Sequence, residues 1–165
     1  MGAVQLRHWV ADDLDAFFDI YSRWDVMRWL GPQPRRALVD LDEARERLAR
    51  WQARERELAD PYGLWAIVPD GSGHPVGTAL LLPLHDGDGP TGEVEVGWHL
   101  HPDHQGRGLA TEAARRLLRD APPGVLALTD PDNERSQAVA RRLGMRDEGL
   151  TDRWFGLTAR QFRAP

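Results

Sequence analysis

The chain of 165 residues contains no cysteine and no lysine, and it has no long run of apolar residues. Without cysteine, disulfides and thiolate metal sites are excluded. A helix that crosses a membrane needs about 20 consecutive apolar residues, which no part of this sequence supplies. The N-terminus also lacks a basic segment followed by an apolar stretch, so we expect no secretory signal. These absences predict a cytoplasmic protein that has no membrane partner.

Arginine supplies all 21 residues counted as Lys+Arg, against 26 Asp and Glu, for a formal net charge of -5. Charges of both signs are interspersed, and a mildly acidic balance argues against binding to nucleic acid. The length suits one domain with a sizeable core, and no linker, repeat or low-complexity tract divides it. We therefore expect a single domain over residues 1–165.

Hydrophobic periodicity predicts a chain that mixes strands and helices. The expected helices cover residues 12–24, 40–58, 108–120 and 136–144. The expected strands cover residues 4–10, 62–68, 76–84, 93–101, 125–129, 145–150 and 154–162. Turns rich in Gly, Asp and Pro join the second, third and fourth strands, which predicts an antiparallel meander. The order of elements is that of a mixed α/β layer architecture.

The stretch HPDHQGRGLATEA, residues 101–113, joins the fourth strand to the third long helix. At a helix N-terminus the first backbone N–H groups lack intrahelical partners, and the macrodipole is positive. Gly106 and Gly108 have no Cβ, so an anion can approach these groups, and Arg107 adds a guanidinium suited to phosphate. A Walker loop would need a lysine, and a dinucleotide fingerprint would need a glycine where Thr111 stands. The stretch therefore predicts a di- or polyphosphate site of another type.

Four segments resemble, in order, motifs of the GNAT superfamily of acyl-CoA-dependent N-acetyltransferases, and in particular its RimJ/RimL-type branch. QGRGLA, residues 105–110, is similar to the family's [QR]-x-x-G-x-[GA] motif. EVGWHLHP, residues 95–102, resembles the strand that precedes this motif. GLWAIV and VGTALL resemble the paired central strands, and DNERSQAVARRLGM, residues 132–145, resembles the N-x-x-S-x-x-V-x-x-x-L-G-[MF] segment. The similarity covers nearly the whole chain.

The resemblance implies a GNAT-type α/β fold: a mixed, mostly antiparallel sheet that is splayed between strands 4 and 5 and flanked by helices. Acetyl-CoA would lie in the cleft as co-substrate. Its pyrophosphate would contact the backbone amides of Gln105, Gly106, Arg107, Gly108, Leu109 and Ala110. Its pantetheine would pair like an added strand with Trp98, His99 and Leu100. Asn133 would also contact the cofactor.

The reaction implied is direct attack of a neutral amine on the thioester, which requires a base, an oxyanion donor and a proton for the thiolate. Glu93 and Glu95 lie two residues apart on one strand, so both point to one face. Glu95 matches the family's strand glutamate and is the candidate base, acting through water, with Glu93 as second choice. A solvated carboxylate is the alternative for Glu95. The oxyanion donor would be a backbone N–H near His99 or Leu100, at a bulge in the strand.

The sequence indicates the group that protonates the departing thiolate less clearly than it indicates the base. Many family members carry a tyrosine four residues before the glycine of the G-[FM] element, where this chain has Ala140. The serine of the N-x-x-S segment, Ser136, is the candidate acid, and an ordinary residue at a helix start is the alternative. A coenzyme A thiolate leaves readily, so the reaction can also proceed without an acid.

His99, His101 and His104 raise the question of a metal, because H-x-H places two imidazoles on one strand face. His101 stands at a position whose residue type varies in the family, and His104 stands where the family often has a packing aromatic. We therefore expect no metal. His99, which lies near the expected thioester, is instead a further candidate for proton transfer.

The acceptor wall in this family comes from the first two helices and the last hairpin, so Trp24, Trp29 and Trp51 either face the substrate or belong to the core. The expected acceptor is a primary amine, on a small molecule or a protein N-terminus, and the acidic balance slightly favours a cationic one. A homodimer is common among relatives. Two other classes stay open: a catalytically weak acyl-CoA-binding module, and a structural domain, which Gly106 and Gly108 disfavour.

Overall fold

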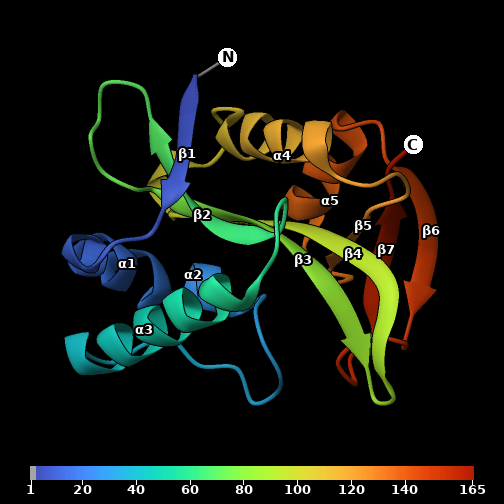
Figure 1. The fold of residues 1–165 in the computed structure, drawn as a ribbon, viewed down its shortest axis with the longest axis horizontal. Helices are drawn as coiled ribbons and strands as arrows, with labels where there is room; N and C mark the ends of the chain where they lie inside the picture. Colours follow the sequence, from blue (N-terminus) through green and yellow to red (C-terminus); the bar gives the residue numbers. More distant parts are fainter. Residues whose placement is uncertain (1–2) are drawn as a thin grey trace.

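A computed structural model describes residues 3–165, and its seven strands join one sheet in the order β1-β2-β3-β4-β5-β7-β6. The strands are β1 (Val4–His8), β2 (Gly63–Pro69), β3 (Gly77–Asp86), β4 (Gly89–Leu100), β5 (Leu126–Thr129), β6 (Arg146–Thr151) and β7 (Ala159–Arg163). The α-helices are α1 (Leu14–Tyr21), α2 (Trp24–Met27), α3 (Leu41–Glu57), α4 (Leu109–Asp120) and α5 (Glu134–Arg142). Figure 1 shows α1, α2 and α3 on one face of the sheet and α4 on the other. The mixed, mostly antiparallel α/β sheet flanked by helices is confirmed.

Each face of the sheet has its own cluster of buried apolar side chains. Beneath α4, Val94 and Val96 of β4 pack in one cluster with residues of α4 such as Ala113. On the opposite face α1 and α3 contribute Phe17, Leu48 and other residues to a second cluster. Because side chains alternate along a strand, the odd-numbered residues of β4 point toward this second face.

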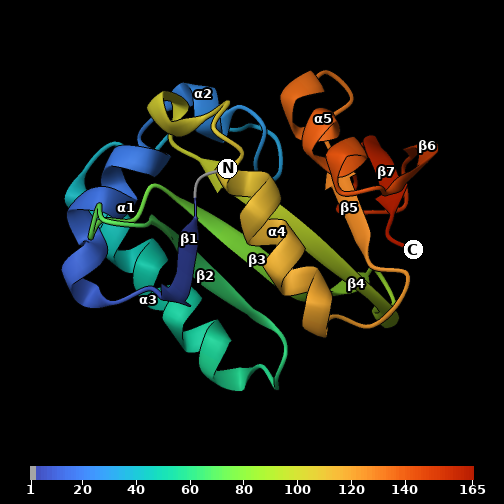
Figure 2. The ribbon, with the colours of Figure 1, turned by 90° about the horizontal axis from the view of Figure 1, so that it is seen from above.

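The parallel pair of β4 and β5 is joined at a single position, Glu95 opposite Leu126. On its other edge, β4 pairs with β3 without interruption from Val94 to Leu100. Beyond Glu95, therefore, the edge of β4 that faces β5 has no strand partner among the described residues. In Figure 2 β5 runs beside α5, apart from the end of β4. The splay predicted between strands 4 and 5 is confirmed.

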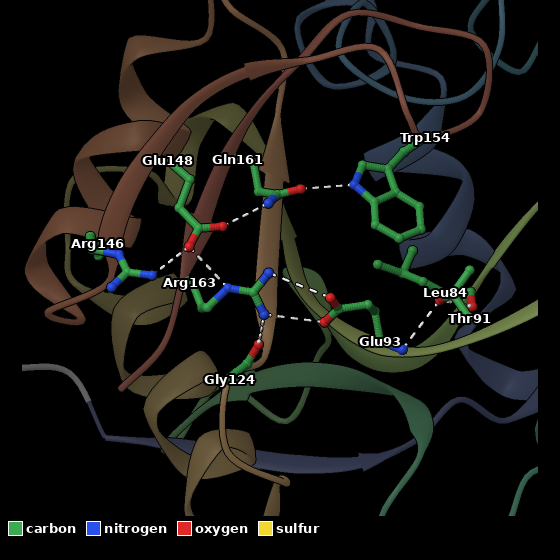
Figure 3. Close-up of polar contacts among 9 residues, drawn as sticks. All are labelled: Leu84, Thr91, Glu93, Gly124, Arg146, Glu148, Trp154, Gln161 and Arg163. Atoms are coloured by element: carbon green, nitrogen blue, oxygen red, sulfur yellow. Dashed lines mark hydrogen bonds and ion pairs between the residues drawn. The ribbon is translucent and has the colours of Figure 1, made fainter.

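A cluster of charged side chains joins β4, β6 and β7 at the closed end of this split (Figure 3). Arg163 of β7 donates to the two carboxylate oxygens of Glu93 at 3.2 and 3.4 Å, and to the Gly124 carbonyl at 3.0 Å. Its Nε donates to Glu148 of β6 at 3.0 Å. Hydrogen bonds, of which that from Arg146 has the largest effect, lower the pKa of Glu148 to about 2. Arg163 of β7 thus links β7 to β4 and β6 where the sheet is continuous.

The first predicted helix, residues 12–24, is interrupted. It begins as a short 3-10 turn, Ala11–Asp13, and continues as α1, which ends at Tyr21. Arg23 then takes an extended backbone, with φ -84° and ψ 121°, and precedes the separate helix α2. The spacing of apolar residues in the sequence does not reveal this break, because Trp24 continues the helical spacing of the apolar residues before it.

The last predicted strand, residues 154–162, is wrong in its first half. Phe155 and Gly156 have φ of 56° and 66°, which is a turn conformation, so β7 begins only at Ala159. Trp154 is 1% exposed, and its Nε1 donates to Gln161 at 2.8 Å. The predicted turn at residues 85–92 is also shorter than expected, because the ladder continues to the pair Asp86 and Gly89.

Replacing Arg163 with alanine should lower the free energy of unfolding by about 1–3 kcal/mol, because partly buried carboxylates lose a charged hydrogen-bond donor. The control is Arg45→Ala, whose partner Asp42 is highly exposed, so that its loss should cost less than about 0.5 kcal/mol. Urea unfolding followed by circular dichroism measures both values. Equal stability of the two variants would contradict the role given to Arg163.

Candidate active site

A cleft of about 1070 Å³ lies between the end of β4, the start of α4, the start of α5 and the segment around α2. Ten residues that the sequence predicts to act here line it: Trp98, His99, Leu100, Gln105, Gly106, Gly108, Leu109, Ala110, Asn133 and Ser136. Two predicted residues, Arg107 and Glu95, are not part of its lining. The structure thus brings together segments that are far apart in the sequence, at the place where the sheet splits.

The loop before α4 presents a row of free backbone donors. Within residues 3–165, the N–H groups of residues 106–111 donate to no acceptor. Gly108 has φ 78°, a left-handed conformation that favours glycine, and it precedes the first residue of α4. These donors lie at the positive end of a helix dipole, which makes them suited to an anion. Such an arrangement can hold a phosphate without any side-chain cation.

Gln105 differs from the residues that follow it. Its backbone N–H already donates to the Pro102 carbonyl at 3.2 Å, so this amide is engaged within the protein. Its side chain donates to the Leu100 carbonyl at 3.2 Å and accepts from Arg135 at 2.7 Å. Gln105 therefore ties the loop to β4 and to α5, and the free donors begin one residue later.

The end of β4 does not have the bulge that was expected near His99 and Leu100. The register with β3 is regular from Gly77 opposite Leu100 to Pro83 opposite Val94, and it shifts only beyond Pro83. A Cβ on Gly77 would collide with the His99 carbonyl, so glycine is needed for this close approach. The prediction of a bulge at the cleft is therefore wrong, although the free edge of β4 is present.

Glu95 points toward the face of the sheet that carries α1 and α3, and its side chain is partly exposed. Burial raises the pKa of its carboxyl to about 7, and the charge of Arg54 opposes this shift. Within the described residues the carboxyl forms no ion pair with an arginine at contact distance, in contrast to Glu93, which binds Arg163. A carboxyl with a pKa near 7 can accept a proton at neutral pH. The paired Glu93 is less suited to this role.

His99 belongs to a buried polar network. Its Nδ1 lies 3.0 Å from the Tyr21 hydroxyl, which lies 2.6 Å from the Thr78 hydroxyl. Burial lowers the pKa of His99 to about 4, and the charge of Arg47 shifts it in the same direction. The imidazole is therefore neutral near pH 7 and is a weak base compared with Glu95.

Asn133 and Ser136 occupy the first turn of α5. Asn133 is the N-cap, and its side-chain oxygen accepts from the Ser136 backbone N–H at 3.2 Å. The capping role considered for the serine thus belongs to Asn133. The Ser136 side chain lines the cleft, and its hydroxyl has no hydrogen-bond partner within residues 3–165.

The three histidines around the end of β4 have separate partners. His101 is 6% exposed, its Nδ1 accepts from the Asp103 N–H at 3.2 Å, and its Nε2 lies 3.3 Å from Asp19. The ring of His104 meets that of His101 edge-on at 5.8 Å. His99 faces Tyr21 instead. In the described part of the chain, no three His, Asp or Glu side chains converge as metal ligands would.

An ion pair that the sequence did not indicate ties the segment after α2 to the loop after β5. Arg35 donates to Asp130 and to the Arg28 carbonyl, both at 2.7 Å. The two side chains are 12% and 16% exposed, so the pair is largely shielded from water. The partners lie 95 residues apart, and no local pattern marks either of them. The pair fixes one wall of the cleft relative to the other.

Of the three tryptophans expected at the acceptor wall or in the core, one lines the cleft, one packs in the core and one does neither. Trp29 lines the cleft. Trp51 packs edge-on against Tyr21, with ring centroids 5.4 Å apart, and belongs to the core beneath α3. Trp24 is 52% exposed and does not line the cleft.

The structure predicts a pH-dependent contribution of Glu95 to stability. Its pKa in the folded protein is about 7, against an ordinary value of 4.5, so the folded state keeps a proton that the unfolded state releases. The free energy of unfolding of the wild type should therefore fall, relative to Glu95→Gln, as the pH rises from about 4.5 to about 7. Thermal melts of both proteins between pH 4.5 and 8 measure this difference. The same pH dependence in both would contradict the raised pKa.

Comparison with known proteins places this geometry in a family. A family model described as an acetyltransferase (GNAT) domain matches residues 4–146. The uncharacterized N-acetyltransferase YnaD of Bacillus subtilis (strain 168) is 35% identical over 61 residues, which is 34% of this chain and 36% of YnaD. A second curated relative matches over 52% of its own length. The chain thus spans about half, or less, of the length of these relatives.

Solved structures share the fold over most of their length. An acetyltransferase from Agrobacterium tumefaciens str. C58 has a TM-score of 0.72 at 25% identity and covers 98% of this chain, with 90% of that chain covered. RimL, a ribosomal L7/L12 alpha-N-protein acetyltransferase solved with coenzyme A, has a TM-score of 0.74 at 17% identity, with 97% and 92% covered. RimL is thus among the proteins that share this fold. With its family model matched from β1 to β6, the chain belongs to the GNAT acetyltransferase family.

Proposed function

We propose that this protein transfers the acetyl group of acetyl-CoA to a primary amine, on a small molecule or a protein N-terminus. The observation that carries the proposal is the row of free N–H groups of residues 106–111, at the N-terminus of α4 and beside the unpaired edge of β4. A diphosphate fits the first feature and an extended amide chain fits the second. Coenzyme A contains both in one molecule.

Different backbone segments of the cleft would bind different parts of acetyl-CoA. The backbone of Gly106, Arg107, Gly108, Leu109 and Ala110 would hold the pyrophosphate, and Arg107 is exposed beside it. The backbone of Trp98, His99 and Leu100 would pair with the pantetheine amides. Asn133 and Ser136 lie on the far side of the cleft, at the start of α5. This division agrees with membership of an acetyl-CoA-dependent family.

The chemistry needs a base for the attacking amine, and Glu95 is the candidate because its pKa is raised and because it matches the family's strand glutamate. Its pKa of about 7 lets it accept a proton at neutral pH, through water because it lies outside the lining of the cleft. The amine nitrogen then forms a bond to the acetyl carbon, and the bond from that carbon to sulfur breaks. The Ser136 hydroxyl is the candidate that donates a proton to the sulfur, because it lines the cleft without a protein partner.

We also propose that residues 1–165 act as a single domain, because the seven strands join one sheet. The reaction would take place in the cytoplasm, where acetyl-CoA is available. The chain has no cysteine and so forms no disulfide that would require an oxidising compartment. Within the described residues no helix is long and apolar enough to cross a membrane. The homodimer common among relatives stays a prediction.

The alternative is a module that binds acyl-CoA with little catalysis. It shares the free N–H groups and the edge of β4 with an enzyme, and it differs in giving Glu95 and Ser136 no chemical role. The raised pKa of Glu95 favours the enzyme, because an ordinary surface carboxylate would titrate near 4.5. Release of coenzyme A in the presence of an amine panel separates the two.

Acetyl-CoA should stabilise the fold, by about 2.7 kcal/mol at roughly 100 times its dissociation constant. Gly108→Glu should weaken its binding by more than about tenfold, because a carboxylate would occupy the place of the anion. Gly144→Glu is the matched control, since Gly144 has φ 77° and Gly108 has φ 78°, and an added Cβ meets no atom at either position. Thermal shifts and calorimetry with acetyl-CoA measure both variants. Equal affinities in the two folded variants would contradict the phosphate site.

The two candidate catalytic residues should differ in their kinetic signatures. Glu95→Gln should lower kcat by about 10²-fold or more near pH 7, and less at high pH, where more of the amine is already deprotonated. Ser136→Ala should lower kcat by less, because the thiolate leaves readily, with the affinity for acetyl-CoA nearly unchanged. Initial rates between pH 6 and 10 measure both. A loss for Glu95→Gln that is equal at every pH would assign it to substrate positioning, and an unchanged Ser136→Ala would leave the serine a helix-start residue.

A further inference from the structure

The face of α5 that lines the cleft carries an arginine at each end. Arg135, Ala138, Val139 and Arg142 all belong to the lining, and their spacing places them on one side of the helix. Ala138 and Val139 are short, so they leave the space between the two arginines open. An α-helix rises about 10 Å over seven residues, so the two guanidinium groups extend from separate points along this wall. The α5 side of the cleft is therefore positively charged at both ends.

Both arginines reach from α5 toward the loop and first turn of α4, which lie beside α5 (Figure 2). Arg135 Nη1 donates to the side-chain oxygen of Gln105 at 2.7 Å, and Arg142 Nε donates to the Thr111 hydroxyl at 3.4 Å. Gln105 immediately precedes the row of free N–H groups of residues 106–111, and Thr111 is its last member. The two arginines of α5 thus contact both ends of the segment that the proposed function assigns to the pyrophosphate.

Neither contact neutralises the charge of the arginine. The amide oxygen of Gln105 and the hydroxyl of Thr111 are uncharged acceptors, and 3.4 Å is long for a hydrogen bond. Within residues 3–165 neither guanidinium pairs with a carboxylate, and the nearby Glu134 lies 3.8 Å from Arg141 instead. Both arginines are exposed and can be hydrated. Phosphate oxygens form charge-assisted hydrogen bonds about twice as strong as neutral ones, so they would replace these contacts.

A third arginine of the lining, Arg28, also has no carboxylate partner in the described chain, so this property alone does not distinguish the arginines of α5. Arg28 stacks on Trp29, with its guanidinium 4.5 Å from the ring centroid. Both residues belong to the segment around α2, and within residues 3–165 the Arg28 side chain forms no hydrogen bond to the loop before α4. Direct contact with the anion-binding segment is therefore what distinguishes Arg135 and Arg142.

We propose that Arg135 and Arg142 bind phosphate oxygens of the acetyl donor, opposite the free backbone N–H groups. This inference rests on the acetyl transfer proposed above and adds two side chains that select the donor by its phosphates. When the donor binds, Arg135 exchanges the neutral amide oxygen of Gln105 for a charged phosphate oxygen. A guanidinium offers parallel N–H donors that match phosphate. Coenzyme A carries a diphosphate and a separate ribose phosphate, and either can supply these oxygens.

The test compares Arg135→Gln and Arg142→Gln with Arg141→Gln, which removes the same charge from the same helix. Arg141 does not line the cleft, and it contacts Glu134 and Gln137 of its own helix. Calorimetry with coenzyme A measures the dissociation constants, and thermal melting without ligand verifies the fold. We expect each cleft variant to bind about fivefold more weakly, the double variant about 20-fold more weakly, and Arg141→Gln as tightly as the wild type.

Two related probes identify the phosphate that each arginine contacts. Dephospho-coenzyme A lacks the ribose phosphate, and pantetheine lacks every phosphate. A loss of affinity that persists with dephospho-coenzyme A assigns the arginine to the diphosphate, and a loss seen only with coenzyme A assigns it to the ribose phosphate. Both results support the proposal. Pantetheine, measured in competition with coenzyme A, should bind to all variants as it does to the wild type.

An affinity for coenzyme A within about twofold of the wild type in either cleft variant would overturn the proposal and leave acetyl transfer standing. An equal loss for pantetheine would assign the arginines to the shape of the cleft and would also overturn it. The same loss in Arg141→Gln would indicate a general effect of charge, with the same consequence. A wild type that does not bind coenzyme A would overturn the proposed function, and this inference with it.

Discussion

The divergence of β4 from β5 is the constraint on which the candidate site depends. The two strands meet at one position, Glu95 opposite Leu126. Before this point Arg163 binds carboxylates of β4 and β6 and keeps the strands together. After it, the hydrogen-bonding edge of β4 has no strand partner within residues 3–165, whereas a buried strand inside a continuous sheet has its N–H and C=O groups paired. The cleft and the free edge are therefore two consequences of the same split.

The split also explains why chemically similar side chains on one strand have different properties. Glu93 and Glu95 point to the same face, two residues apart, but Glu93 lies where the strands are held together and Arg163 can reach it. Glu95 lies at the branch point, where no cation is in contact and burial raises its pKa to about 7. His99, further along, is partly buried beside Tyr21, and this burial lowers its pKa to about 4. The environment of each position, rather than residue type, separates the candidate base from its neighbours.

Much of this arrangement could be predicted from local sequence. The apolar spacing of α3 and α4 places both helices within about two residues, and the glycines around Arg107 indicate the turn that precedes α4. The strands whose side chains alternate between two covered faces were also predictable. The family motifs add the splay, which no periodicity reveals. These are features that depend on neighbours in the chain or on a short motif.

What the sequence did not reveal depends on contacts between distant residues or on single backbone conformations. The turn at Phe155 requires a positive φ that is rare for an aromatic residue, so the pattern favoured a strand there. The contacts of Tyr21 with His99 and of Arg35 with Asp130 join residues 78 and 95 positions apart, and neither pair has a local signature. The bulge expected near His99 and Leu100 was carried over from the family, whereas the ladder between β3 and β4 is regular there, with Gly77 passing close to the His99 carbonyl.

The distribution of charge is also something that the whole-chain balance conceals. A net charge of -5 slightly favours a cationic acceptor, but three acidic side chains of α3, those of Asp42, Glu43 and Glu46, are already paired with arginines. Arg47 on the same helix has no carboxylate partner within residues 3–165, and its one polar contact there is the Met27 sulfur. Net charge governs solubility and long-range attraction, whereas recognition at a partly buried site depends on the few charges that lack partners there.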